Sequence, residues 1–363
     1  MNNENIKYKI TLTPIDKFFF GGDMTFQVGV NENDTFNEQF SSYIIKSAMY
    51  PQQTSLLGML RYLILRNSGE EIFKDGKIVD KGKAEELIGC QSFFVNIGHA
   101  DNGFGKIVNL SRVRVQQTVR ANRKVSELEF SPFYGKMDWK DSDKGWFGFN
   151  KSFIPKMPDY NAKKGLVVKL TDGVIQYDLN DVFIEDRRIG IQRNINTGKT
   201  GDGALFKQIS YRFNNKEANY CFTFDTEIAA DVAFKSYNGQ VVSVGGDNSN
   251  FIIGITECET YNNSESQIDN AIYLLSPAFL TREDVGLAKF AITDIIPFRF
   301  LESSVYAKSY SILNKDVKRS NVRYELYKAG SIFYFENNKA KNDFIEKLES
   351  KKEFRQIGYN EYK

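Results

Sequence analysis

The sequence of 363 residues predicts an α+β protein that contains more strands than helices. Runs in which apolar and polar residues alternate occur along most of the chain, as in strands that are half buried. Aromatic residues make up 14% of the chain, and Phe and Tyr favour sheets with large packed faces. Seven prolines and no low-complexity tract argue against disorder. A chain of this length can form one large or two small domains.

The first elements predict a ferredoxin-like unit of the type found in RNA-recognition domains. Residues 6–15 alternate and predict a strand, and residues 18–23 predict a tight loop. Pro51 opens a predicted helix that stops before Gly69. A strand, a loop and a helix in this order begin a ferredoxin-like unit. The apolar face of that helix contains Leu56, Leu57, Leu60, Leu63 and Ile64.

The last third of the chain predicts a second ferredoxin-like unit. Residues 330–336 predict a strand, and Asn338 is the predicted cap of a helix that runs through Leu348. A glycine turn and a last strand are expected within residues 354–362. Residues 130–165 predict a loop-rich insertion with possible partner contacts. Further short strands are predicted at residues 220–224, 240–244, 251–255, 271–276, 305–313 and 322–327.

Residues 187–213 predict a long hairpin with a strongly basic character. Its arms lie at residues 189–193 and 205–212, and a glycine-rich tip lies between them. Six basic residues and one acid give the segment a net charge of +5. An arm that grips a phosphate backbone would use this charge, and an ordinary solvated hairpin is the alternative.

Two other segments are also basic, although the whole chain has a net charge of only +2. Residues 106–124 carry a net charge of +6, and residues 299–328 carry +4. A nucleic-acid site would therefore be a local patch. Basic strands with interleaved Tyr and Phe suit single-stranded RNA, which is bound by charge and by stacking of bases. A charged edge strand that avoids aggregation is the alternative for residues 106–124.

The sequence does not predict an enzyme, a metal site or a cofactor. His99 is the single histidine, and no second residue that could act with it is evident. The thiols of Cys90, Cys221 and Cys258 lie far apart and predict reduced cysteines in a cytoplasmic protein. Residues 245–248 lack the second carboxylate of a two-metal hairpin, and residues 197–201 lack the spacing of a phosphate loop. The N-terminal residues contain no apolar signal core, and no apolar run is long enough to span a membrane.

An ordered series of short motifs resembles the RAMP superfamily of type III CRISPR–Cas effectors, and most closely the third subunits of Cmr (type III-B) complexes. Each motif is short, but together they cover most of the chain. They are Pro51-x-x-Thr54-x-x-x-Gly58-x-x-Arg61, Gly190-Ile191-Gln192-Arg193 ahead of Gly203-x-Leu205-Phe206, Gly245-Gly246-Asp247, Gly330-Ser331, and Gly358-Tyr359-Asn360. The last loop has one glycine where the family usually has several.

The resemblance implies two ferredoxin-like units with β-rich insertions and a projecting β-hairpin thumb. The expected divisions are residues 1–185, 186–214 for the thumb, and 215–363. It also implies a non-catalytic subunit that binds the repeat-derived 5′ tag of the crRNA. The implied protein partners are the large cyclase-type Cas subunit and the first backbone RAMP subunit of the filament.

The candidate RNA-binding residues follow from the resemblance together with their positions in the predicted elements. Gln52 and Thr54 lie at a helix start, where phosphate contacts are favourable. Arg61 lies within that helix, so an intramolecular ion pair is an equal alternative. Gly358 lies in the C-terminal glycine loop. The remaining candidates are Arg112, Arg114, Arg120, Gly190, Gln192, Arg193, Lys199 and Lys207.

Three alternatives to this function remain open from the sequence. The first is the equivalent subunit of a type III-A or III-D complex. The second is a RAMP endoribonuclease that processes crRNA and uses His99, or a Tyr and Lys pair, as acid and base. The third is a β-rich module that binds carbohydrate or protein.

Overall fold

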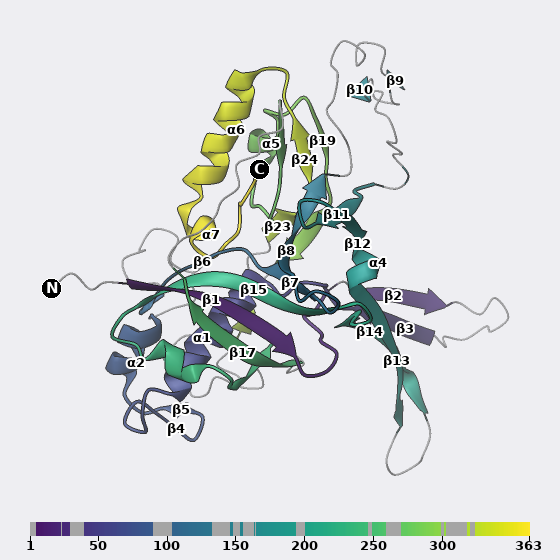
Figure 1. Ribbon diagram of the computed structural model, residues 1–363. Coiled ribbons are helices and arrows are strands. Elements are labelled where there is room, and N and C mark those ends of the chain that lie inside the picture. Colours follow the sequence, from purple (N-terminus) through teal and green to yellow (C-terminus); the bar gives the residue numbers. More distant parts are fainter. Residues whose placement is uncertain are drawn as a thin grey trace.

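The computed structural model shows a mixed α/β protein that consists mostly of sheet (Figure 1). Among the described residues, no helix is long and apolar enough to cross a membrane. The structure describes residues 5–22, 24–29, 40–89, 104–132, 146–147, 153–154, 163, 165–193, 200–245, 249–258, 270–298, 301–302, 318–319 and 324–363.

A nine-stranded sheet forms the larger part of the fold. Its order is β12-β11-β8-β7-β15-β1-β17-β16, and β6 also pairs with β15. The first strand therefore lies between two strands from the second half of the chain. The strands are β1 (Asn5–Pro14), β6 (Ile107–Leu110), β7 (Arg114–Val119), β8 (Val125–Pro132), β11 (Val168–Thr171), β12 (Gln176–Asp178), β15 (Ala218–Ala229), β16 (Val241–Val244) and β17 (Ser249–Glu257).

Helices α1 (Gln53–Arg66) and α2 (Lys81–Ile88) lie on one side of this sheet (Figure 1). Alternation along β1 directs Tyr8, Ile10 and Leu12 into the core, where the apolar face of α1 is also buried. The helix predicted after Pro51 is confirmed. The opposite face of the sheet carries the polar residues that alternate with these core residues, and several of them form ion pairs.

A cluster of aromatic rings joins the sheet to the base of the hairpin. The ring centroids of Phe213 and Phe222 lie 4.9 Å apart, and those of Phe18 and Phe222 lie 5.2 Å apart. Phe183 and Phe251 also contact Phe222. These rings come from β13 (Phe183–Arg193), β14 (Thr200–Phe213), β15, β17 and the loop after β1. Their packing therefore fixes where the hairpin leaves the sheet.

The hairpin predicted at residues 187–213 is formed by β13 (Phe183–Arg193) and β14 (Thr200–Phe213). The two strands pair from Phe183 with Phe213 to Ile191 with Leu205, and the register shifts before Arg193. The observed arms begin earlier than predicted. A four-stranded sheet of order β13-β14-β3-β2 results, in which β3 (Phe40–Lys46) pairs parallel to β14 and β2 (Met24–Gly29) pairs antiparallel to β3.

The C-terminal part has a smaller sheet covered by a helix (Figure 1). Its order is β18-β24-β19, with β18 (Ala271–Tyr273), β24 (Ile332–Tyr334) and β19 (Phe290–Ile292). Helix α6 (Asn338–Ser350) packs on it through Phe344, whose ring centroid lies 4.8 Å from that of Phe333. The cap of α6 is Asn337, which accepts a hydrogen bond from the Ala340 amide, so the prediction of Asn338 was one residue late.

The glycine turn predicted within residues 354–362 is found at residues 357–358, but the predicted last strand was wrong. Residues Lys352–Gln356 form helix α7, in which the Phe354 ring stacks on Phe279 at 5.0 Å. Only Tyr362 forms a β-bridge, with Leu274. Phe354 and Tyr359 are buried on either side of the turn rather than along one strand.

Other predicted strands are found at β15, β16, β17, β18 and β23 (Tyr324–Tyr327), whereas residues 305–313 lie outside the described part of the chain. Most of the predicted insertion at residues 130–165 also lies outside it. The remaining elements are β4 (Phe73–Lys74), β5 (Lys77–Ile78), β9 (Trp146–Phe147), β10 (Phe153–Ile154), α4 (Leu179–Val182), η2 (Phe234–Tyr237), α5 (Arg282–Val285), β20 (Ile295–Phe298), β21 (Leu301–Glu302) and β22 (Lys318–Arg319).

Replacing Phe222, which is fully buried, with Ala should lower the free energy of unfolding by about 3–5 kcal/mol, because the aromatic cluster loses its central ring. Urea denaturation measures this change. Ile252→Ala, at a side chain that is 46% exposed, serves as the control and should cost less than about 1 kcal/mol. Equal losses in the two variants would show that the cluster does not stabilise the fold.

Candidate nucleic-acid interface

Three segments that are distant in sequence meet at the start of helix α1. Gln53 is only 2% exposed, and its Nε2 atom donates hydrogen bonds of 2.7 Å to the carbonyl oxygens of both Ser111 and Ile357. These contacts connect the helix start with the loop before β7 and with the C-terminal loop. We call this arrangement, formed by residues 52–54, 111–112 and 357–361, the helix-start junction.

Gly358 is required at this junction for two reasons. Its φ of +81° lies in the left-handed region, which side chains rarely adopt. A Cβ atom at this position would also overlap Gln53 Nε2 and would lie 2.5 Å from the carbonyl carbon of Ser111. The glycine therefore allows the C-terminal loop to approach the helix start closely.

The helix start itself offers groups that suit an anion. The N-cap residue Gln52 makes no side-chain capping hydrogen bond, and both Gln52 and Thr54 are half buried rather than enclosed. The amino end of a helix carries partial positive charge and favours phosphate groups. Tyr359 is buried behind this point, where burial raises the pKa of its hydroxyl and the neighbouring Thr54 opposes that rise.

Arg112 also belongs to the junction, but its guanidinium is already paired. It forms ion pairs with Glu129, at 2.5 Å, and with Glu361. Its backbone N–H donates to the other oxygen of Glu361 at 2.8 Å. Arg112 therefore holds the C-terminal residues against the sheet.

Arg114 has a similar structural role on the polar face of the nine-stranded sheet. Its guanidinium pairs with Glu127 at 2.9 Å and with Asp225, and Glu127 also pairs with Lys9. Burial opposes the charge on Arg114, but the two carboxylates outweigh this effect and raise its pKa. These pairs connect β7, β8, β15 and β1.

Arg61 and Arg120 lie away from these ion pairs. The guanidinium carbon of Arg61 lies 5.7 Å from the ring centroid of Phe104, so its charge interacts with an aromatic face. Arg120 is exposed in the turn after β7 and donates to Asn219 Oδ1 at 3.0 Å. Because a strand rises about 3.3 Å per residue, Arg120 lies roughly 20 Å along β7 from Arg114. The structure therefore does not bring Arg114 and Arg120 together.

The hairpin candidates form a separate group. Gly190 pairs with Phe206, and Lys207 pairs with Ile189, on neighbouring positions of β13 and β14. Lys207 is half buried. Gln192 and Arg193 lie in β13, where the backbone alone is described, and Lys199 lies outside the described residues.

Two acids reduce the positive charge at the base of the hairpin. Glu185 pairs with Lys46 at 2.8 Å and with Arg187 at 2.7 Å. Asp186 pairs with Lys17 at 3.2 Å. The hydrogen bond from Lys46 is the largest of the effects that lower the pKa of Glu185. The predicted segment began at Arg187 and did not include Glu185 and Asp186. The net charge of +5 therefore overestimates the positive charge of the whole hairpin.

Sequence reasoning did not identify Gln53, which contributes most to the junction. A signal was available: Gln53 is a polar residue at the helical spacing of the buried positions Leu56, Leu57 and Leu60. A polar residue on such a face needs internal hydrogen-bond partners. Glu361 was not identified because its partner, Arg112, is far away in sequence.

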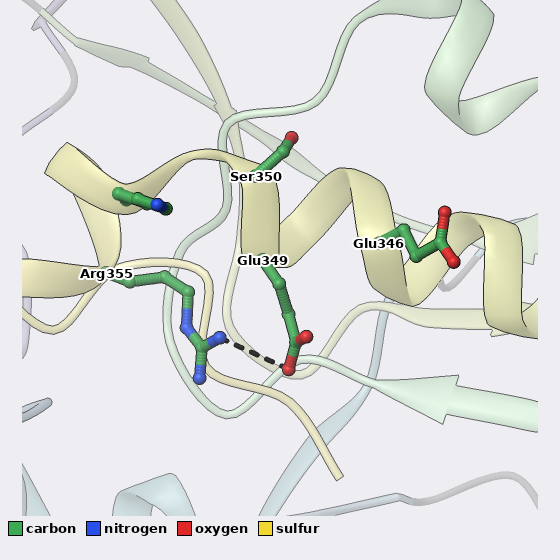
Figure 2. Close-up of a pocket in the computed structure, with 5 residues that line it drawn as sticks. Glu346, Glu349, Ser350 and Arg355 are labelled. Carbon is green, nitrogen blue, oxygen red and sulfur yellow. Dashed lines mark ion pairs between the residues drawn. The ribbon is translucent and has the colours of Figure 1, made fainter.

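A pocket lies on α6 and α7, next to the C-terminal loop of the helix-start junction (Figure 2). Its volume is about 550 Å³. Figure 2 shows the pair between Arg355 and Glu349, which are 3.2 Å apart. The two carboxylates and the two basic side chains of the lining balance each other, so the pocket has no dominant charge. Its lining residues are Glu346, Glu349, Ser350, Lys352 and Arg355.

Comparison with known proteins identifies the class of this chain. A family model described as "CRISPR-associated protein (Cas_Cmr3)" matches residues 10–362. The chain belongs to this family of CRISPR-associated proteins. It is thus a Cmr3-type CRISPR-associated protein.

Two solved structures that are similar to this chain come from type III-B Cmr complexes. One is a chain of "Cryo-EM structure of the Type III-B Cmr-beta bound to cognate target RNA and AMPPnP, state 1", with 14% identity, a TM-score of 0.48, and coverage of 98% of this chain and 95% of that chain. Another comes from the Cmr-beta complex "bound to cognate target RNA", with 15% identity, a TM-score of 0.48, and coverage of 98% and 96%. No curated protein sequence matches the chain.

Replacing Gly358 with Ala should destabilise the protein by more than the left-handed backbone alone explains. Gly239 provides a matched control, since its φ is +83° and a Cβ atom there would have no neighbour within 4 Å. Gly239→Ala should lower the free energy of unfolding by about 1–2 kcal/mol. Gly358→Ala should lower it by at least about 1 kcal/mol more, because the added Cβ atom overlaps its neighbours. Urea denaturation of both variants measures the difference, and equal costs would contradict the close approach.

Replacing Arg114 with Ala should lower the free energy of unfolding by about 3 kcal/mol or more, because Asp225 and Glu127 lose their common partner in a partly buried site. Lys74→Ala removes an exposed ion pair with Glu70 and should lower the free energy of unfolding by only about 0.2–1 kcal/mol. Chemical denaturation compares the two variants. A loss at Arg114 as small as that at Lys74 would show that the buried pairs contribute little.

Proposed function

We propose that this chain is a non-catalytic crRNA-binding subunit of a type III-B CRISPR effector complex. In this role it holds the repeat-derived 5′ tag and docks both the large cyclase-type Cas subunit and the first backbone RAMP subunit. The observation that carries the proposal is the family match, which extends over residues 10–362. Assembly in the cytoplasm is part of the same proposal.

The strand order supports two ferredoxin-like units. In the first unit β1, α1, β7, β15, η2 and β17 follow the β-α-β-β-α-β order, with the short helix η2 in the place of the second helix. In the second unit β18, α5, β19, β24 and α6 follow the same order and end at the bridge between Tyr362 and Leu274. The two units have equivalent strand orders, β7-β15-β1-β17 and β19-β24-β18 followed by Tyr362.

This arrangement supports a different division between the two units from the one predicted at residue 214. Strands β15 and β17 follow that residue but pair directly with β1. We therefore place the end of the first unit after residue 258. The hairpin of β13 and β14 is an insertion within that unit, and we propose that it acts as the thumb.

We propose that the crRNA contacts come from two of the groups described above. At the helix-start junction the contacts are made by Gln52, Thr54 and the backbone around Gly358, where the end of α1 favours phosphate. On the hairpin they are made by Gly190, Gln192, Arg193, Lys199 and Lys207. Arg112 and Arg114 position these elements through their ion pairs, and Arg61 packs on Phe104.

The double variant Arg193→Ala/Lys199→Ala should bind crRNA more weakly in the assembled complex. Each lost phosphate contact should reduce the slope of log K against log salt concentration by about 0.7, so the slope should fall by about 1.4. Fluorescence anisotropy at several salt concentrations measures this slope. Lys339→Ala/Lys347→Ala, at two exposed positions on α6, removes the same charge as the double variant and should leave the slope unchanged. An unaltered affinity and slope in the double variant would contradict the thumb role.

The same purified protein tests whether the subunit is catalytic. Incubation with repeat RNA should yield no specific product. Specific cleavage that disappears in His99→Ala would identify an endoribonuclease and overturn the proposal.

A further inference from the structure

Asn360, in the C-terminal loop, combines an unusual backbone conformation with complete burial. Its φ is +57°, and it is 0% exposed. A left-handed backbone is uncommon for residues other than glycine, although asparagine tolerates it. Asp75 and Arg123 also have positive φ, but both are exposed. Glycine would adopt the conformation of Asn360 with less strain, so the side-chain amide is what distinguishes this residue.

The amide of Asn360 joins two other segments to the C-terminal loop. Its Oδ1 atom accepts a hydrogen bond of 2.9 Å from the backbone N–H of Phe279. Its Nδ2 atom donates to the carbonyl oxygen of Leu348 in α6, at 3.2 Å, and to that of Phe279, at 3.5 Å. The backbone N–H of Asn360 donates to Pro277 at 3.0 Å. Because the oxygen and the nitrogen of the amide both have partners, the side chain is held in one position.

The same loop contacts the start of α1 at its other end. The carbonyl oxygen of Ile357 accepts the 2.7 Å hydrogen bond from Gln53. A side chain at Gly358 would overlap Gln53, so the two segments lie as close as their backbones allow. Tyr359, between Gly358 and Asn360, is also buried. Helix α6 and the residues after β18 are therefore connected to the start of α1 through this short loop.

We propose that Asn360 is a positioning residue for binding of the crRNA tag. Its amide fixes residues 357–359 where they meet the start of α1, and Asn360 itself does not touch RNA because it is completely buried. A binding site that is already ordered loses less conformational freedom when its ligand binds. The inference rests on the proposed function, since it concerns the tag contacts proposed at the helix-start junction.

The test compares two RNAs, one with the repeat-derived 5′ tag and one with the same guide but no tag. Asn360→Gly keeps the backbone conformation and removes only the amide. In a complex reconstituted with this variant, the preference for the tagged RNA should fall at least about tenfold, because a displaced loop weakens hydrogen bonds to a charged phosphate. Affinity for the untagged RNA should not change. Fluorescence anisotropy measures both dissociation constants.

Asn270→Gly is the matched control, because Asn270 also has a left-handed backbone, with a φ of +54°. This variant should keep the preference of the wild type. Asn360→Asp is measured as well, so that the result does not depend on the folding of one variant. Its carboxylate can accept from Phe279 but cannot donate to Leu348, so the preference should fall here too.

Two results would overturn the inference while the proposed function stands. One is a preference for the tagged RNA that both Asn360 variants retain. The other is a parallel loss of affinity for both RNAs together with a lower melting temperature, which would show that Asn360 only stabilises the fold. A wild-type complex that does not distinguish the two RNAs would overturn the proposed tag binding and the inference together.

Discussion

The hydrogen bonds of Gln53 are the interaction on which the arrangement of this protein most depends. One buried amide joins the first helix, the loop before β7 and the C-terminal loop. The close approach of these segments leaves no space for a side chain at Gly358. Because the pair of Arg112 and Glu361 reinforces the same contact, the end of the chain is fixed against the start of α1 and the loop before β7. The tag-binding residues proposed at the helix-start junction thus lie where these three segments meet, whereas those proposed on the hairpin form a separate group.

Charge has two separate roles in this chain. Arg114 on the polar face of the nine-stranded sheet and Arg112 in the loop before β7 are enclosed by carboxylates and stabilise the fold. In the turn before β8, Arg120, Arg123 and Lys124 remain exposed. A basic stretch in the sequence, such as residues 106–124, can therefore contain both residues that stabilise the fold through ion pairs and residues that stay exposed. Which of the two a residue is depends on whether a distant strand supplies a partner.

Local patterns predicted the secondary structure well where one periodicity dominates. The alternation in residues 6–15, the apolar face after Pro51 and the two arms of the hairpin all correspond to observed elements. The predicted cap of α6 was one residue late. Within residues 354–362 the predicted glycine turn is found, but a helix and a single bridge at Tyr362 stand in place of the predicted strand. Long-range pairing was inaccessible, since nothing local indicates that β1 lies between β15 and β17 or that Glu361 meets Arg112. For the candidate site, the sequence identified Thr54 and Gly358 as separate motifs, and the structure brings their segments together.

Photo-crosslinking of the assembled complex tests the central claim most directly. The crRNA would carry a photoreactive nucleotide at each position of the 5′ tag in turn, and mass spectrometry would map the linked residues. We expect crosslinks to residues 52–54, to residues 357–361 and to the hairpin at residues 190–207. Crosslinks that avoid all three segments and map instead to α6, or to none of this chain, would contradict the account.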